Sequence, residues 1–304
     1  KQHHQTDSEV PIDYSHKYTY KLMPFINKDI NYDLAISFLT PHYIVSHKVN
    51  AKKKIAWIHT DYGHVETDIE SQLNMWGSYN YIASISQAVA TNFLKNFPQL
   101  EDKLIEIPNI LPIKLISKQA DEFDVSNEMI DDGSVKLLSI GRYCEAKNFD
   151  NVPFICKRIL ELGLNVKWYI MGFGGDEERI KKSIKECNME EHVILLGKKS
   201  NPYPYIKACD VYVQPSRYEG KCVSVIEAQS LHKPVVITNY ATSASQLDNG
   251  IDGVIVPMDN EGCAKGIVNF INNKELQIKI INNLKQRDYS NAIEVEKIYA
   301  LMEE

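Results

Sequence analysis

Two glutamates separated by seven residues stand in the segment YEGKCVSVIEAQSL, at positions 219 and 227. Glu219 directly precedes Gly220, and a helical pattern begins near Cys222, so Glu227 falls one to two turns inside the predicted helix. Carboxylates are strong acceptors for sugar hydroxyl groups but poor partners for phosphate. The spacing therefore predicts two acids that bind two different hydroxyl groups.

The backbone between these two acids is suited to an anion. Gly220 would let the chain approach a ligand closely. The N–H groups of Lys221, Cys222 and Val223 would open the predicted helix, and a helix N-terminus favours phosphate through its free N–H groups and its dipole. We therefore expect a phosphate site flanked by the two carboxylates.

A second loop offers two cations. In the segment SIGRYCEAKNF, Gly141 lets the chain turn at the end of a predicted strand, and Arg142 and Lys147 follow within one short loop. A guanidinium fork and a mobile ammonium group suit a pyrophosphate. Two solvated surface cations are the alternative, which only the proximity of other phosphate-binding groups excludes. The glycines of GFGG at 172–175 resemble a dinucleotide fingerprint, but a tight turn alone would also need them.

The elements that would carry these loops alternate regularly from about residue 135 on. Short β-branched runs followed by helical patterns are typical of a parallel sheet covered by helices on both faces. Right-handed crossovers bring the loops together at the carboxyl ends of the strands, where we expect the ligand. The predicted strands are 135–140, 166–171, 193–197, 211–216, 234–238 and 253–257.

The first part of the chain shows the same alternation, with predicted strands at 32–39, 53–59 and 81–86 and a helix at 87–97. The polar, acidic stretch 118–133 ends in Asp-Asp-Gly, which favours a surface connection. We therefore expect an N-terminal Rossmann-like domain at 1–117, a linker at 118–133 and a C-terminal Rossmann-like domain at 134–287. A final helix at 288–304 is expected to cross back to the N-terminal domain.

Composition excludes several classes of protein. The formal net charge is −6, without the basic excess of a nucleic-acid binder, and no apolar run approaches the roughly 20 residues that span a bilayer. The six cysteines are widely scattered, which is typical of buried thiols in a reducing compartment and not of a zinc or iron–sulfur site. The polar N-terminus lacks the apolar core of a signal peptide. These features predict a cytoplasmic protein.

The motifs together resemble those of the retaining glycosyltransferase family 4, which has the GT-B fold. Glu219 and Glu227 match its E-x7-E motif, GRYCEAKN its phosphate loop, and EAQSLHKPVVIT its E-A-x-x-x-x-x-P-V-V stretch. The segment LLGKKSNPYPYIKACDVYVQPS is similar to the strand and helix that hold the nucleotide base. The resemblance is strong over 135–260 and moderate over 54–112.

This resemblance implies roles for single residues. Arg142 and Lys147 would bind the diphosphate, Glu227 the ribose, and Glu219 the hydroxyl groups of the donor sugar. The implied fold is two Rossmann-like domains facing a cleft. His59, after a strand of the first half, would face the donor sugar, although a lone histidine at a strand end is more often structural. Further expected contacts are the donor-binding Gly197, Lys198 and Lys199 and the acceptor-side Asp61 and Tyr62.

The resemblance also implies the reaction and its substrates. We expect transfer of a hexose-type sugar from a nucleotide-diphosphate sugar, UDP rather than GDP, to a glycan or lipid-linked glycan of a bacterial surface polysaccharide. No metal or other cofactor is expected. Lys52, Lys53 and Lys54 would touch an anionic inner leaflet, unless they form an ordinary solvated face.

One departure from the family pattern keeps other functions open. No Gly-rich loop precedes Tyr32, so the N-terminal domain is expected to be incomplete. A nucleotide-sugar epimerase or a nucleotide-sugar-binding module without catalysis are the alternatives. An epimer formed from donor alone would indicate the first, and donor binding without transfer or hydrolysis would indicate the second.

Overall fold

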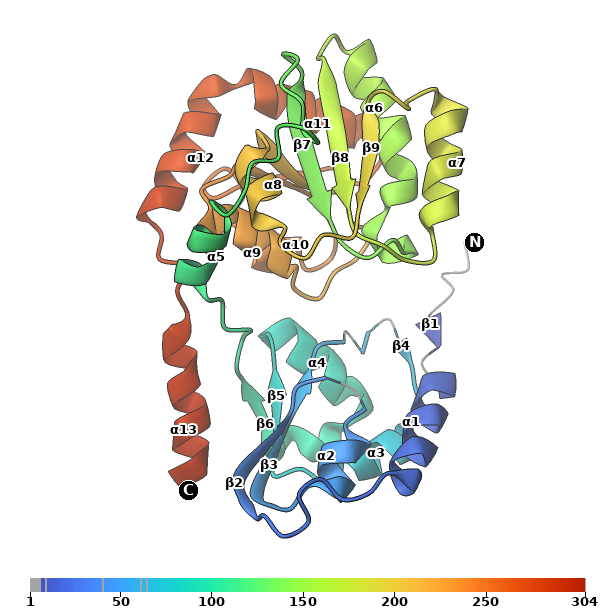
Figure 1. Ribbon diagram of the computed structural model, residues 1–304, viewed down its shortest axis with the longest axis vertical. Coiled ribbons are helices and arrows are strands. Elements are labelled where there is room, and N and C mark those ends of the chain that lie inside the picture. Colours follow the sequence, from blue (N-terminus) through green and yellow to red (C-terminus); the bar gives the residue numbers. More distant parts are fainter. Residues whose placement is uncertain (1–6, 9, 40, 61, 64, 304) are drawn as a thin grey trace. The chain divides into compact units, whose positions relative to one another are not determined.

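The structure is a computed structural model that describes residues 7–8, 10–39, 41–60, 62–63 and 65–303. The chain folds as two compact units. The first consists of the described residues up to Ile110 together with those from Asn291 on, and the second is Leu111–Ser290. Each unit has a parallel sheet and a core of its own (Figure 1).

The second unit is built on a parallel sheet of six strands. These are β7 (Val135–Ile140), β8 (Val166–Met171), β9 (Val193–Gly197), β10 (Val211–Gln214), β11 (Val235–Thr238) and β12 (Val254–Val256). Their order is β12-β11-β10-β7-β8-β9, so the chain runs outward from β7 to β9 and then returns to pair β10 with the other side of β7. The order therefore reverses between β7 and β10, and ligands of open α/β sheets bind at the carboxyl ends of the strands at such a point.

The predicted strands of this unit are confirmed. Three of them have the predicted bounds, and the others are shorter by one or two residues at an end. Three of the shorter ends lie at prolines: β10 stops before Pro215, β11 starts after Pro234, and β12 stops before Pro257. Proline has no N–H for the sheet ladder, so it stands at or beyond the end of a strand.

Helices cover both faces of this sheet (Figure 1). Neighbouring strand residues point to opposite faces: Leu137 and Trp168 belong to one buried cluster, whereas Leu138 and Tyr169 belong to the other. The first cluster takes side chains from α6 (Val152–Glu161), α7 (Glu177–Cys187), α11 (Asn260–Asn272) and α12 (Lys274–Gln286), and the second from α8 (Tyr203–Ala208) and α9 (Val223–Ser230).

The first unit has a smaller parallel sheet, in the order β2-β3-β5-β6. Its strands are β2 (Tyr32–Ser37), β3 (Ala51–Ile58), β5 (Tyr81–Ser84) and β6 (Leu104–Glu106), and two short strands, β1 (Asp7–Ser8) and β4 (Val65–Glu66), pair separately. The three predicted strands and the predicted helix are confirmed. The helix is α4 (Gln87–Asn96), capped by the Ser86 side chain. Three further helices of this unit are α1 (Val10–Leu22), α2 (Tyr43–Lys48) and α3 (Ile69–Gly77).

The segment 118–133, predicted as a surface linker, belongs to the second unit. It follows α5 (Ile113–Gln119), and its apolar side chains Val125 and Met129 are buried in the cluster beneath α8 and α9. Glu128 accepts a hydrogen bond from Tyr205 at 2.5 Å. The prediction was wrong because the acidic residues dominate the composition of the segment, whereas two well-spaced apolar residues decide where it packs.

The tail contains a short 3₁₀ turn, Ala292–Glu294, and the helix α13 (Val295–Glu303). Leu301 lies in the core of the first unit, and the Lys297 ammonium group donates to the carbonyl oxygen of Glu106 at 3.1 Å. The last helix is therefore part of the first unit, although the second unit precedes it in the sequence. None of the helices in the described part of the chain has the length and apolar character needed to cross a membrane.

Candidate functional site

The loops after β7 and β10 meet at the point where the strand order of the second sheet reverses. The first loop carries Arg142 and Lys147 and the second carries Glu219. Two contacts fix one loop on the other: Asn148 donates through its side chain to the Pro215 carbonyl oxygen at 2.9 Å, and the Arg217 N–H donates to the Ala146 carbonyl oxygen at 2.8 Å. The predicted convergence of these loops is thus present.

Lys147 and Glu219 form an ion pair, with 2.5 Å between Nζ and Oε1. Both side chains are largely shielded from water, at 17% and 12% exposure. Gly141 makes room for this arrangement, because a Cβ at that position would lie 3.0 Å from Cε of Lys147. Burial opposes the charge on Lys147, but Cys222 and Glu219 outweigh it, so the pKa of the ammonium group lies above its ordinary value.

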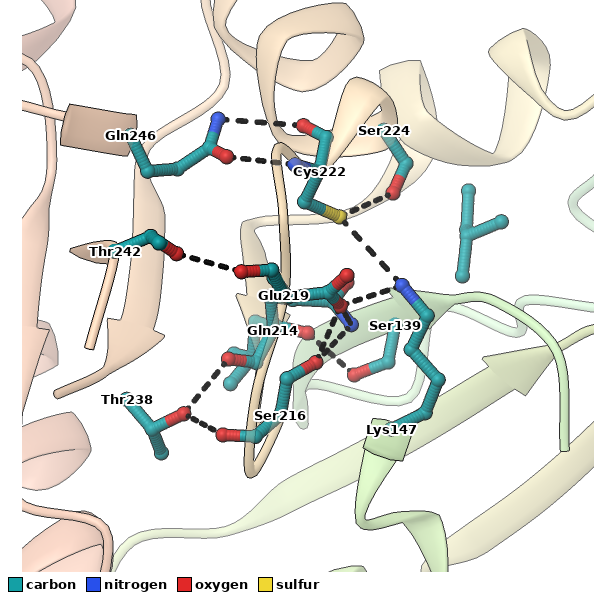
Figure 2. A network of polar contacts seen from close by, with 12 residues as sticks. Ser139, Lys147, Gln214, Ser216, Glu219, Cys222, Ser224, Thr238, Thr242 and Gln246 are labelled. Atoms are coloured by element: carbon teal, nitrogen blue, oxygen red, sulfur yellow. Dashed lines mark hydrogen bonds and ion pairs between the residues drawn. The ribbon is translucent and has the colours of Figure 1, made fainter. Parts of the chain in front are cut away.

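Three donors converge on one oxygen of the Glu219 carboxylate (Figure 2). Besides Lys147, the Ser216 hydroxyl donates to Oε1 at 2.6 Å and the Gln214 amide at 3.4 Å. Among the described residues no partner reaches Oε2. The carboxylate is therefore fixed through one oxygen, and the other remains available to a ligand hydroxyl group.

A series of buried hydrogen bonds holds the residues that contact this carboxylate. The Gln214 side chain donates to Ser216 and accepts from the Tyr212 hydroxyl, each at 2.8 Å, and both Gln214 and Tyr212 are fully buried. The Tyr212 hydroxyl also lies 2.7 Å from the Ser224 hydroxyl of α9. Burial raises the pKa of Tyr212 well above its ordinary value, so the group stays protonated. These hydrogen bonds thereby join the end of β10 to the start of α9.

The segment between Glu219 and α9 is clamped from the side by α10 (Ser243–Gln246) and the residue before it (Figure 2). The Gln246 amide pairs with one residue's backbone, accepting from the Cys222 N–H at 2.7 Å and donating to the Cys222 carbonyl oxygen at 3.3 Å. The Thr242 hydroxyl donates to the Glu219 carbonyl oxygen at 2.7 Å. We call Thr242 and Gln246 the loop clamp.

The loop clamp corrects one sequence expectation. Cys222 was expected to offer a free N–H to phosphate, but that group is already bonded to Gln246. Cys222 is instead the N-cap residue of α9, and its buried sulfur lies 3.9 Å from Lys147 Nζ. Burial, followed by the charge of Glu219, raises the pKa of its thiol. The expectation for the N–H groups of Lys221 and Val223, next to Gly220, stays a prediction.

Glu227 lies on α9, half-buried, as predicted from the helical pattern. It accepts a hydrogen bond from the Tyr203 hydroxyl of α8 at 2.9 Å. Burial raises the pKa of the carboxyl group, and the Tyr203 hydrogen bond offsets only part of this effect. Among the described residues, Tyr203 is thus the single partner of this desolvated carboxyl group.

The remaining predicted donor residues lie at the carboxyl ends of β7 and β9. Arg142 is exposed, and none of the described acids forms an ion pair with it. Gly197 ends β9 with a φ of 66°. Lys198 lies over the ring of Phe173, 4.9 Å from its centroid. Lys199 forms an ion pair with Glu128, so its charge is already balanced by an acid of the same unit.

The glycines of GFGG have a structural role. A Cβ at Gly172 would lie 1.9 Å from the Gly141 carbonyl oxygen, and one at Gly174 would lie 2.4 Å from that of Tyr143. Both glycines also have φ values of 152° and 158°, where side chains are rarely found. They allow the loop after β8 to pack directly on the loop that carries Arg142 and Lys147.

The residues predicted in the first unit are described within that unit alone. His59 follows β3, its ring lies 4.5 Å from that of Phe38, and its Nε2 atom is buried without a hydrogen-bond partner among the described residues. Burial lowers the pKa of this imidazole. Tyr62 was expected to contact the acceptor, but its ring is buried in the core and its hydroxyl donates to Gln72 at 2.6 Å. Asp61 lies outside the described residues.

Several functional candidates escaped prediction from the sequence. Ser216, Gln214 and Tyr203 belong to segments that were already singled out, but only their contacts show which acid each one holds. Gln246 lies 24 residues beyond the backbone that it binds. No local pattern indicates such a pairing. In the described part of the chain, His, Cys, Asp and Glu side chains form no group of three or more that could hold a metal ion.

The chain is similar to named proteins over about half to three-fifths of its length. A Campylobacter jejuni protein, N-acetylgalactosamine-N,N'-diacetylbacillosaminyl-diphospho-undecaprenol 4-alpha-N-acetylgalactosaminyltransferase, is 29% identical over 195 residues, 62% of this chain and 52% of its own. An Escherichia coli protein, UDP-Gal:alpha-D-GlcNAc-diphosphoundecaprenol alpha-1,3-galactosyltransferase, is 25% identical over 58% of this chain and 47% of its own. The chain spans about half the length of the curated relatives that it matches.

Solved structures extend the likeness in fold to almost the whole chain. Anabaena Alr3699/HepE in complex with UDP and glucose has a TM-score of 0.74 at 15% identity, covering 96% of this chain and 81% of its own. A mutant of Staphylococcus aureus TarM in complex with UDP has a TM-score of 0.66 at 21% identity, over 85% of this chain and 52% of its own. The two Rossmann-like α/β units are those of the GT-B fold. Residues 121–287, more than half of the chain, match the model of Glycosyl transferases group 1, so the chain belongs to that family.

Proposed function

We propose that the chain is the donor-binding and catalytic part of a retaining glycosyltransferase with an E-x7-E motif, formed by Glu219 and Glu227. It would move a hexose-type sugar from a nucleotide-diphosphate sugar, UDP rather than GDP, to a glycan acceptor. The observation that carries the proposal is the Glu219 carboxylate, fixed through Oε1 by Lys147 and Ser216 beside the start of α9. One carboxylate oxygen then faces the ligand while a cation stands at its side.

The roles divide by charge. Arg142, exposed and unpaired among the described residues, and the ammonium group of Lys147 would bind the two phosphates. Glu227 would accept from the ribose hydroxyl groups and Glu219 from those of the donor sugar, since a carboxylate binds hydroxyl groups well and repels phosphate. The free N–H groups at the start of α9 would add to the phosphate site. In the first unit, His59 has an imidazole nitrogen without a partner among the described residues, which suits a donor or acceptor contact to a sugar.

The chemistry would rest on charge stabilisation. As the bond to the anomeric carbon breaks, negative charge develops on the departing diphosphate, and Arg142 and Lys147 would stabilise it from fixed positions. A phosphate oxygen would take up the proton of the acceptor hydroxyl group on the same face of the sugar. No residue of the second unit is needed as a covalent nucleophile, and no metal is needed to neutralise the diphosphate.

The acceptor is proposed from the relatives. The two relatives above are named for transfer to saccharides on diphospho-undecaprenol, and another Staphylococcus aureus relative is named poly(ribitol-phosphate) alpha-N-acetylglucosaminyltransferase. We infer a glycan of a surface polysaccharide as the acceptor, lipid-linked at the inner face of the membrane.

The test begins with the donor. Thermal unfolding is followed with UDP-glucose, UDP-galactose, UDP-N-acetylglucosamine and GDP-mannose, because a ligand that binds only the native state raises the melting temperature. The ligand that stabilises most is then offered, labelled in the sugar, with a lipid-linked saccharide acceptor. Transfer with retained anomeric configuration is the expected result. Binding without transfer or hydrolysis would reduce the protein to a binding module, an epimer formed from donor alone would make it an epimerase, and stabilisation by none of the four would contradict the donor site.

A further inference from the structure

A buried carboxylate, that of Asp150, joins the loop that carries Lys147 to the loop that carries Glu219. Its side chain is 9% exposed and accepts from both NH groups at the end of the Arg217 guanidinium, at 3.0 Å and 3.1 Å. A bidentate pair of this kind fixes the orientation of both side chains as well as their distance. Asp150 stands three residues after Lys147, and Arg217 two residues before Glu219. The pair therefore joins the two loops within three residues of each member of the Lys147–Glu219 ion pair.

The same arginine also holds the backbone on the other side of Lys147. Its guanidinium donates to the Glu145 carbonyl oxygen at 2.6 Å, and its backbone N–H donates to the Ala146 carbonyl oxygen at 2.8 Å. Arg217 thus binds the chain before Lys147 through two carbonyl groups and the chain after Lys147 through Asp150. The backbone position of Lys147 is therefore set from both directions by one residue of the neighbouring loop.

A second guanidinium reaches the same carboxylate. Arg179 of α7, which is more exposed than Arg217, forms an ion pair with Asp150 at 2.8 Å. Two arginines from different elements thus share one acid. Without that acid the two guanidinium groups would repel each other, and Arg217 would lose the carboxylate that it pairs with. The charge of Asp150, and not only its shape, is what keeps the two loops together.

We propose that Asp150 is a positioning residue of the donor site, which sets the place of Lys147 relative to Glu219. It acts through Arg217 and does not touch the ligand, because guanidinium groups occupy both of its oxygens. This role rests on the proposed function, in which Lys147 stabilises the departing diphosphate and Glu219 binds the donor sugar. A misplacement of about 1 Å can cost about 100-fold in rate, so a carboxylate outside ligand contact can still control the reaction.

A second two-point ion pair in the same unit provides the matched control. Arg158 of α6 donates to both carboxylate oxygens of Glu261 in α11, at 2.6 Å and 3.1 Å. This pair joins two helices and includes no residue of the loops after β7 and β10. Glu261→Gln therefore removes the same charge from the same kind of pair as Asp150→Asn does, but away from the donor site.

The first measurement needs no sugar transfer. The full chain is acetylated briefly with N-hydroxysuccinimidyl acetate, and peptide mapping by mass spectrometry gives a rate for each lysine. Lys147 should react slowly in the wild type, because its ammonium group is shielded and paired with Glu219. In Asp150→Asn it should react several-fold faster, because displacement from the acid removes both the pairing and the shielding. In Glu261→Gln its rate should be that of the wild type.

The second measurement follows transfer. In Asp150→Asn, kcat should fall about tenfold or more while the Kd of UDP changes less than about threefold, because Arg142 keeps its place. Glu261→Gln should stay within about twofold of the wild type in both. The double variant Asp150→Asn/Lys147→Ala should be no slower than Lys147→Ala, because a residue that acts through Lys147 then has nothing left to position. Arg217→Lys keeps the charge but loses the two-point contact, so its loss should be intermediate.

The outcomes separate positioning from a structural role. A lower melting temperature of Asp150→Asn with unchanged Lys147 acetylation and unchanged kcat would overturn the proposal. Losses that multiply in the double variant would overturn it as well, because Asp150 would then act apart from Lys147. If the wild type transfers no sugar, the proposed function fails, whereas the acetylation rates still test whether Asp150 positions Lys147. Should Asp150→Asn not fold, Arg217→Lys is judged by the same two measurements.

Discussion

The Glu219 carboxylate is positioned before any ligand arrives. Lys147, Ser216 and Gln214 hold one oxygen, and Gly141 makes room for the lysine chain. A group positioned in advance needs no reorganisation when charge develops in a reaction, which is the condition for strong electrostatic catalysis. Both partners of the Lys147–Glu219 ion pair are needed, because loss of either one leaves the other charge poorly hydrated and without a counter-charge.

Two substitutions test the proposed division of roles. Arg142→Ala and Glu219→Ala should each lower kcat/KM for transfer roughly 100-fold or more, the scale of one lost stabilising group. Arg142→Ala should also weaken binding of UDP itself, whereas Glu219→Ala should mainly reduce the advantage of UDP-sugar over UDP. Arg158→Ala is the matched control, because its guanidinium forms an ion pair with Glu261 on helix surfaces. Near wild-type turnover in both site variants would contradict the assignment.

Glu227 gives a prediction with a defined sign. Its pKa is raised by burial, so the native state favours the protonated carboxyl group and is penalised once that group ionises. Glu227→Gln should therefore raise the free energy of unfolding at neutral pH, and the gain should vanish below about pH 4.5, where the group is protonated in the unfolded state as well. The same variant should bind UDP less tightly.

Chemical denaturation at about pH 7.5 and about pH 4 measures this effect, with UDP binding followed separately. Tyr203→Phe serves as a companion variant, because it removes only the hydroxyl group that donates to Glu227. An unchanged or lower stability of Glu227→Gln at the higher pH would mean that the carboxylate is not penalised in the native state.

At the scale of elements, the donor site depends on the segment that joins β10 to α9. Besides the side-chain contacts of Ser216, Arg217 and Glu219, α10 with the residue before it holds the segment through two backbone carbonyl groups and one N–H. The start of α9 can point its remaining N–H groups at an anion only while that hold persists. The loop clamp is thus a positioning device for groups that themselves contact the ligand.

Gln246→Ala should expose this dependence. Removing the amide leaves the N–H and the carbonyl group of Cys222 without this partner, which costs about 1–3 kcal/mol. We expect KM for the donor to rise about tenfold and kcat to fall less, because the start of α9, which would shift in this variant, is the proposed phosphate-binding element. Ser245→Ala is the control, since Ser245 is an exposed residue of the same helix and its hydroxyl donates to the Thr242 carbonyl oxygen, away from Cys222. A loss of stability with unchanged KM would show that Gln246 is structural alone.

At the scale of the whole molecule, we expect one buried histidine to make the first unit sensitive to acid. His42 is buried to 4% exposure in the first unit, with its Nδ1 atom 2.8 Å from the Ser37 hydroxyl. Burial, followed by the nearby His59 and His16, lowers the pKa of His42 to about 3. The unfolded chain takes up this proton near its ordinary pKa of 6.5 and the native unit does not, so stability is present above that pH and is lost as the pH falls.

Hydrogen exchange resolves this effect unit by unit. Between about pH 6.5 and about pH 5 the first unit should lose about 1.4 kcal/mol per pH unit from this group. Peptides from β3 should then exchange faster, after correction for the intrinsic pH dependence, than peptides from β7. His42→Asn should remove most of the difference. An unchanged acid sensitivity of the first unit in His42→Asn would be inconsistent with the burial of a neutral His42.

Individual elements show how much of the fold the sequence predicts. The bounds of β7, β8 and β9 were predicted to the residue. A short apolar, β-branched run between polar or glycine residues is typical of a strand that is buried on both faces of a doubly wound sheet. The segment 118–133 was misplaced, since burial of Val125 and Met129 depends on packing against side chains that are distant in the sequence. Tyr62 was misassigned because its place in an aromatic core with Trp76 and Phe93 leaves no local signal.

The sequence by itself determined the two α/β units, the placement of Arg142, Lys147 and Glu219 at strand ends, and the position of Glu227 on the following helix. Periodicity and spacing are local properties, and strand order brings the carboxyl ends together by rule. Only the tertiary structure decided that Lys147 pairs with Glu219, that Gln246 occupies the backbone of Cys222, and that Tyr203 holds Glu227. These contacts join residues 24 to 72 positions apart through three-dimensional packing, which no pattern along the chain records.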